Sequence, residues 1–187
     1  DSSSLQQGLH MKFSAFLPLF VFASFVFSSS KIAAQDIGHS EGGWAIRGTD
    51  PIMIFYGGKH VTSYNAGEMA GKPYFYPVIG PSGENMTRHW PMKEAFEDEA
   101  DDHIQHRGMW YGLGKVNGLD FWHFPLDEKK QKGRPFGVIR HKGMNFVQTS
   151  RDDIRFKVKS EWKSFDKPEK RIMSDTREFR LFYTKSG

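Results

Sequence analysis

An alternation of apolar and charged residues late in the chain constrains the fold more than any other feature. Its members are the apolar Ile154, Phe156, Val158 and Trp162, and between them the charged Arg155, Lys157, Lys159 and Glu161. A period of two over about nine residues is typical of a strand with one buried face. A turn signal at 166–170 and a second alternation through Phe179, Leu181 and Tyr183 follow. This strand–turn–strand pattern predicts an all-β fold, an antiparallel β-sandwich.

Earlier segments fit the same fold class. Short apolar runs at 52–56 and 60–64 flank Gly57-Gly58 and predict a hairpin. A strand is expected at 74–79, where Pro77 favours an edge or an irregular position. Two more are expected at 108–112 and 119–124 around Asn117-Gly118, a favoured turn pair. The acidic stretch 93–102 fits either a short helix or an exposed loop.

The N-terminal part carries a targeting pattern. Met11-Lys12 precedes a mostly apolar run from Phe13 to Phe27, and small residues follow up to Ala34. A basic start, a short apolar core and a small-residue exit predict a signal peptide at 11–34, with an uncleaved anchor as the alternative. Residues 1–10 are then upstream translation, 35–43 a leader and 44–187 the β-sandwich domain. The protein is expected to be secreted or periplasmic, with no membrane span after cleavage.

Charge and cysteine content exclude several functional classes. The chain has no Cys, which excludes disulfide scaffolds, thiolate metal sites and Cys nucleophiles. Residues 35–126 hold 7 basic and 12 acidic side chains, whereas residues 127–187 hold 17 and 9. In the basic half the charges alternate with apolar residues, so they indicate the solvent face of strands, and no nucleic-acid partner is expected.

The residues suited to chemistry gather between 101 and 123. This segment combines three His, three Asp, Arg107, Asn117 and two Trp. His103 and His106 could bind Cu, Zn or Fe, with Asp102, His123 or Glu161 completing the ligand shell. The same histidines could act as acid and base, each oriented by a neighbouring Asp. Each feature also has a structural reading: a hydrogen-bonded His, an ion-paired Arg, a core Trp and a turn Asn.

The segments Asp102-His103…His106-Arg107-Gly108-Met109-Trp110 and Val116-Asn117-Gly118-Leu119-Asp120-Phe121-Trp122 resemble those of a known family. The chain is similar to the bacterial proteins labelled methane oxygenase PmoA-type over residues 44–187. The resemblance departs at Ile104-Gln105, where that family has Pro-His. It implies a soluble β-sandwich domain that continues beyond this length, so the chain is expected to be an N-terminal portion. The bacterial distribution and export of the family are similar to those of polysaccharide-utilisation proteins.

The sequence therefore predicts an exported carbohydrate-active enzyme whose ligand is a glycan or another small molecule. The residues expected to be catalytic are His103, His106, Arg107, Asp102 and Asp120. Those expected to contact the substrate are Trp110, Asn117, Trp122 and His123. One alternative is a metal-dependent oxidoreductase that uses His103 and His106, and another is a non-catalytic carbohydrate-binding module. The oligomeric state stays open.

Overall fold

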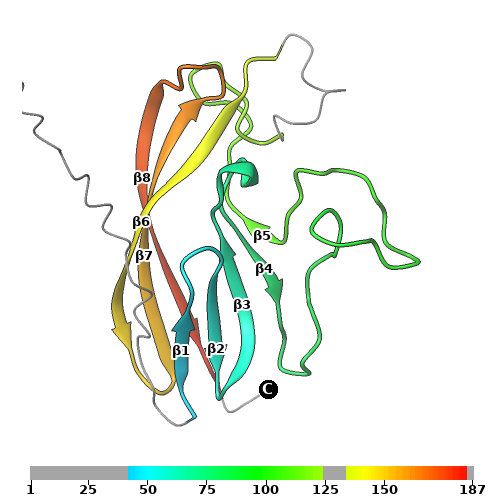
Figure 1. The fold of residues 1–187 in the computed structure, drawn as a ribbon, viewed down its shortest axis with the longest axis vertical. Coiled ribbons are helices and arrows are strands. Elements are labelled where there is room, and N and C mark those ends of the chain that lie inside the picture. The colour runs from blue at the N-terminus through cyan, green and yellow to red at the C-terminus, as the bar shows by residue number, and fades with distance from the viewer. Residues whose placement is uncertain (1–41, 124–133, 185–187) are drawn as a thin grey trace, which may run out of the picture. The chain divides into compact units, whose positions relative to one another are not determined.

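Two antiparallel sheets form the fold in the computed structural model, which describes residues 42–123 and 134–184 (Figure 1). The first sheet holds five strands in chain order: β1 (Trp44–Arg47), β2 (Ile52–Tyr56), β3 (Lys59–Asn65), β4 (Tyr74–Val78) and β5 (Met109–Trp110). The second holds β6 (Gly137–Thr149), β7 (Asp153–Ser164) and β8 (Arg171–Phe182). A short 3-10 helix, η1 (Glu68–Ala70), lies between β3 and β4. The predicted all-β antiparallel sandwich is confirmed.

Tight turns join the strands where the sequence carries turn residues. Gly57 and Gly58 both have positive φ, +55° and +77°, and they link β2 to β3 as the sequence predicted. Two consecutive left-handed residues match the twist of a hairpin, and glycine adopts that conformation without steric cost. The turn predicted at 166–170 connects β7 to β8, which pair along their whole length from Asp153↔Phe182 to Lys163↔Arg171.

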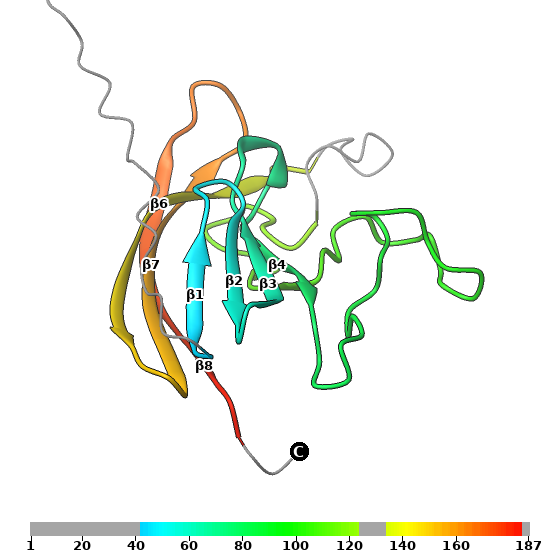
Figure 2. The same ribbon diagram turned by 60° about the horizontal axis from the view of Figure 1, so that its bottom comes forward.

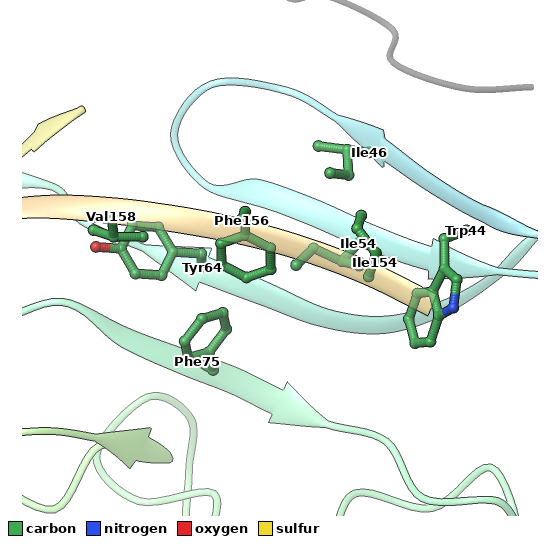
Figure 3. Packing of buried hydrophobic residues seen from close by; sticks show 8 residues of the cluster. All are labelled: Trp44, Ile46, Ile54, Tyr64, Phe75, Ile154, Phe156 and Val158. Atoms are coloured by element: carbon green, nitrogen blue, oxygen red, sulfur yellow. The ribbon is translucent and has the colours of Figure 1, made fainter. Parts of the chain in front are cut away.

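The main core lies between the two sheets (Figure 3). The inward side chains of β7, Ile154, Phe156 and Val158, are at most 1% exposed. They pack with a buried set from the other sheet: Trp44, Ile46, Ile54, Tyr64 and Phe75. Because each fully buried large apolar side chain contributes about 1.5–3 kcal/mol, this shared core holds the sheets face to face.

A second apolar cluster anchors the loop that follows β5. Phe121, Ile139 and Trp162 are its buried members, and the rings of Phe121 and Trp162 lie 4.8 Å apart. Gly137 makes room for this contact, since a Cβ there would lie 2.2 Å from the Phe121 ring. The Trp162 Nε1–H donates to Asp175 Oδ2 at 2.7 Å. The segment 111–123 is thereby fixed to the three-stranded sheet through Phe121.

Three details differ from the sequence-based expectations. Strand β6 was not predicted from the alternation, because two bulges interrupt its register, at His141/Gly143 and at Phe146/Gln148. The strand expected at 119–124 is wrong, because residues 119–123 form only isolated bridges, Val116↔Leu119 and Asp120↔Phe136. The stretch 93–102, by contrast, follows one of its two expected alternatives and is a loop. The strand expected at 108–112 is only two residues long, Met109–Trp110.

The predictions for the N-terminal segment mostly concern residues that the structure does not describe. The upstream segment 1–10, the signal peptide 11–34 and most of the leader 35–43 lie outside the described residues, so they stay predictions. Within the described parts of the chain, no helix has the length and apolar character needed to cross a membrane.

Candidate functional site

Four aromatic side chains meet beside the edge strand β5, and we call them the His–Trp cluster: His103, His106, Trp110 and Trp122. The ring centroids of His103 and His106 are 5.1 Å apart and nearly parallel, at 13°. His106 lies 6.2 Å from Trp110 and 6.1 Å from Trp122. The two indoles lie 4.6 Å apart at 65°, and Trp122 is 40% exposed. Side chains from strand β5 and from the loops on either side of it thus form one partly exposed surface.

The backbone at Gly108 sets the approach of the first loop to the sheet. Gly108 has φ +60°, and a Cβ there would lie 2.2 Å from the carbonyl oxygen of Phe75. Only glycine fits this close approach. The chain then enters β5, where Trp110 pairs with Tyr74 of β4. This geometry places Trp110 next to His106.

Arg88 and Glu99 organise the long loop between β4 and β5. Glu99 accepts backbone N–H bonds from His89 at 2.6 Å and from Phe96 at 3.2 Å. The Arg88 guanidinium donates to the carbonyl oxygens of Ala100 and Asp102, and its Nη1 lies 3.3 Å from Asp102 Oδ1. The loop is therefore held at the point where it presents Asp102 and His103.

The first histidine–carboxylate pair joins His103 to Asp102. The Nδ1 of His103 lies 2.5 Å from Asp102 Oδ2, and both side chains are about half exposed, at 50% and 52%. The hydrogen bond from His103, together with the bonds and charge of Arg88, holds the pKa of Asp102 below its usual value. Because Asp102 holds Nδ1, Nε2 is the nitrogen of His103 that can exchange a proton with a ligand.

The second pair joins His123 to Asp120, with 2.7 Å between Nδ1 and Oδ2. The other carboxylate oxygen, Oδ1, accepts the backbone N–H bonds of Trp122 at 2.8 Å and His123 at 3.1 Å. Burial works to raise the pKa of Asp120, but these hydrogen bonds outweigh it and hold the pKa below the usual value. Asp120 therefore fixes the turn that carries Trp122 and His123.

His106 differs from His103 in its surroundings. Burial, followed by the positive charges of His103 and Arg88, lowers the pKa of His106 from its ordinary value of 6.5. An imidazole with a lowered pKa is neutral at pH 7 and carries one nitrogen that can accept a proton. The cluster thus places a neutral imidazole beside one that is paired with a carboxylate.

Lys72 lies beneath the cluster, and sequence reasoning missed it. It is 6% exposed, and its Nζ lies 3.9 Å from the centre of the Trp110 ring. The same Nζ donates to the carbonyl oxygens of Phe121, at 3.2 Å, and Trp122. Burial lowers the pKa of Lys72 to about 7, and the nearby Asp120 carboxylate only partly offsets this. A single lysine between Gly71 and Pro73 carries no motif that could have revealed its burial.

Three other predicted residues lie apart from the His–Trp cluster surface. The Arg107 guanidinium faces the Tyr74 ring at 6.0 Å, and burial lowers the pKa of Arg107. Asn117 has φ +48° and forms the exposed tip of the turn that the sequence predicted at Asn117-Gly118. Glu161, considered as a metal ligand, lies on β7, where it pairs with Lys163 at 3.4 Å and with Arg171 at 3.6 Å.

The donor set does not fit a metal ion. Among the described residues, no group of three or more His, Asp or Glu side chains is placed to share one. His103 and His106 are stacked instead of converging on one point, and Asp102 is engaged by His103 and Arg88. We therefore derive no step that passes through a metal.

Comparison with known proteins identifies the family. The model of a family of unknown function, DUF6807, matches residues 52–186. The chain belongs to this family. The match begins in β2 and extends through β8, so it includes every residue of the His–Trp cluster and Lys72. No curated protein and no solved structure matches the chain.

The family match corrects the resemblance suggested by the segment from Asp102 to Trp122. The matching family is DUF6807, not a methane oxygenase PmoA-type family, so the assignment made from that motif is wrong. The motif consists of a His–Asp loop and an Asn-Gly turn that serve the geometry described above. Function has to be argued from that geometry, because family membership assigns none.

Proposed function

We propose that this domain binds a carbohydrate on the surface formed by Trp110 and Trp122 and acts on it by acid–base chemistry at His103 and His106. The observation that carries this proposal is the placement of two imidazoles in different electrostatic surroundings beside a half-exposed indole. His103 is paired with a carboxylate, whereas His106 is partly buried among positive charges.

Trp122 supplies the binding surface in this proposal. An indole that is 40% exposed and braced at 4.6 Å by Trp110 presents a rigid apolar face. The C–H face of a sugar ring packs on such a surface, while its hydroxyl groups need polar neighbours at the rim. His106, at 6.1 Å from Trp122, and His123, held by Asp120, provide those neighbours.

The two imidazoles take opposite roles in a hydrolytic step. His106 is neutral at pH 7, so it can accept the proton that an attacking water loses. Asp102 holds the Nδ1 of His103, so His103 in its protonated form presents Nε2–H and can donate that proton to the leaving oxygen of the glycoside. Asp120 orients the segment around Trp122, and Arg107 supports the loop from the side of Tyr74.

Turnover of glycans and glycosides by the whole protein tests this proposal. A broad panel is screened, and each substrate that is cleaved is measured again with His103→Gln and His106→Gln. Loss of either proton carrier is expected to reduce kcat/KM by about 100-fold or more. His60→Gln is the matched control, because His60 bonds to Ser63 on β3, outside the cluster. Absence of turnover across the panel contradicts the enzymatic role.

Binding is measured separately from turnover. Trp122→Ala is expected to weaken glycan affinity by about tenfold or more, since large exposed aromatics dominate such contacts. Phe182→Ala, at a residue 57% exposed on β8, is the control for loss of an exposed ring. Binding that depends on Trp122 without any turnover would identify a non-catalytic carbohydrate-binding module instead. The predicted export through the signal peptide at 11–34 would place either activity outside the cytoplasm.

A further inference from the structure

We propose that Lys72 is the positioning residue of the His–Trp cluster: its ammonium group joins the Trp110 ring to the segment 120–123 and thereby holds Trp122 in place. The proposal deepens the proposed function and rests on it for the biological role, but its structural content can be tested without any ligand. No motif in the sequence marks Lys72, and it is far from the residues of the His–Trp cluster along the chain.

The donors of the Lys72 ammonium match the acceptors around it in number. A lysine ammonium has three N–H donors and no acceptor. Around Nζ lie three groups that can receive them: the carbonyl oxygens of Phe121 and Trp122, and the face of the Trp110 ring at 3.9 Å. The ammonium therefore satisfies two carbonyls of the loop and contacts β5 at the same time.

These contacts hold the segment that carries Trp122. Phe121 is anchored in the second apolar cluster, whereas Trp122 is 40% exposed. Two side chains hold the Trp122 backbone: the Asp120 carboxylate accepts its N–H bond, and Lys72 donates to its carbonyl oxygen. Removal of the ammonium leaves both carbonyl oxygens without this donor, so the segment that carries Trp122 loses its link to β5.

The contacts of Lys72 depend on its charge. A neutral amine has only two N–H donors and a lone pair, so one of the three acceptors would lose its partner. Burial lowers the pKa of Lys72 to about 7, so this change falls near neutrality. The charged groups facing Lys72 are Asp120 on the segment that it holds, and His106 and Arg107 on the loop before β5.

Fluorine NMR of protein labelled with 5-fluorotryptophan tests the proposal directly. The chain has five Trp, and Trp110→Phe and Trp122→Phe assign the two signals of the cluster. Both signals are expected to shift with a midpoint near pH 7 and to lose this step in Lys72→Met. His106→Gln should keep the step, because it originates at Lys72. A step that persists in Lys72→Met, or that vanishes in His106→Gln, overturns the proposal.

A second measurement covers the case in which Lys72→Met does not fold. The Nζ signal of Lys72 is followed by nitrogen-15 NMR in the unaltered protein, and it should titrate near pH 7. Titration only near the ordinary lysine value of 10.5 overturns the proposal. Where a glycan ligand is found, Lys72→Met should weaken its affinity by about tenfold while Lys59→Met, on the exposed β2–β3 hairpin, should not. If the fluorine signals behave as expected but no glycan binds, the proposed function is refuted and the positioning role of Lys72 stands.

Discussion

The two sheets of the sandwich differ in how much of their structure lies outside the strands. The strands of the three-stranded sheet are 12 or 13 residues long, and short connections link them. The strands of the five-stranded sheet have between 2 and 7 residues, and a loop of about 30 residues separates β4 from β5. Figure 2 shows this loop projecting from the short strands, whereas the long strands run side by side.

This difference separates the regular core from the candidate site. The three-stranded sheet buries a regular row of large side chains and forms a rigid scaffold. These side chains are Ile154, Phe156, Val158 and Trp162. The segments on either side of the short strand β5, the loop before it and the loop after it, bring His103, His106 and Trp122 together. Functional side chains on loops that a rigid scaffold positions are a common arrangement. The comparison predicts that equal substitutions in the two regions have unequal effects.

The largest contrast is expected between two tryptophans. Trp162→Ala should lower the free energy of unfolding by about 3–5 kcal/mol, because Trp162 is fully buried and its Nε1–H bonds to Asp175. Trp122→Ala should cost about 1 kcal/mol or less, because 40% of Trp122 is already exposed. Urea denaturation followed by circular dichroism measures both free energies. Equal losses would contradict the distinction between the buried core of the three-stranded sheet and the candidate site.

Lys72 is expected to make the stability of the fold depend on pH. The pKa of Lys72 is about 7 in the folded protein and 10.5 for an ordinary lysine, so the unfolded chain binds the extra proton between these values. The free energy of unfolding should therefore rise with pH by about 1 kcal/mol per unit, on the order of 3 kcal/mol across the window.

Denaturation curves collected from pH 7 to 10.5 measure this rise, and Lys72→Met should flatten it. Lys59→Met is the control at an exposed lysine, at the start of β3. The comparison between variants is needed because burial raises the pKa values of Tyr64 and Tyr74, which act in the opposite direction near pH 10 and above. An unchanged slope in Lys72→Met would count against a buried, perturbed lysine.

Two glycines should respond unequally to the same methyl group. Gly108→Ala is expected to cost about 2 kcal/mol or more, since the residue needs φ +60° and its Cβ would meet the Phe75 carbonyl. Gly118→Ala should cost about 1 kcal/mol, because it also needs a positive φ, +84°, but nothing lies within 4 Å of its Cβ. Thermal unfolding of the two variants compares them, and a larger loss at Gly118 would contradict the close approach at Gly108.

The smallest effect is expected on the solvent face of the long sheet. Glu161 lies within 4 Å of three cations, Lys142, Lys163 and Arg171. Among the described residues, Glu178 has one such partner, Lys157 at 3.5 Å. Glu161→Gln should cost about 1 kcal/mol and Glu178→Gln no more than about 0.5 kcal/mol, since exposed ion pairs contribute little. Both losses should shrink in 1 M salt, and losses that are insensitive to salt would contradict an electrostatic origin.

The same contrast explains which parts of the fold could be predicted from the sequence. The alternation at 154–162 and the Gly57-Gly58 pair are local signals, and β7 and the β2–β3 hairpin follow from them. Strand β6 lacks such a signal because its bulges shift the alternation from one face to the other. At 119–124 the apolar residues favoured a strand, but the Asp120 carboxylate bonds the backbone N–H groups of Trp122 and His123 and closes a turn instead.

The candidate site could be predicted only in part for a similar reason. His103, His106, Trp110 and Trp122 are close enough in sequence to suggest a common site, and the structure brings them together. The contact of Lys72 with Trp122 spans 50 residues of chain, and nothing in the local sequence encodes it. The role of Gly137 in admitting the Phe121 ring is likewise a consequence of tertiary packing.

The most direct test of the account locates the ligand-binding surface by NMR, using the indole N–H signals of the five tryptophans during a titration with glycan fragments. The account predicts that the signals of Trp110 and Trp122 shift, while those of Trp44 and Trp162, which are at most 4% exposed in the core, stay in place. Shifts confined to other tryptophans, or absent for every glycan, would contradict a carbohydrate site at the His–Trp cluster.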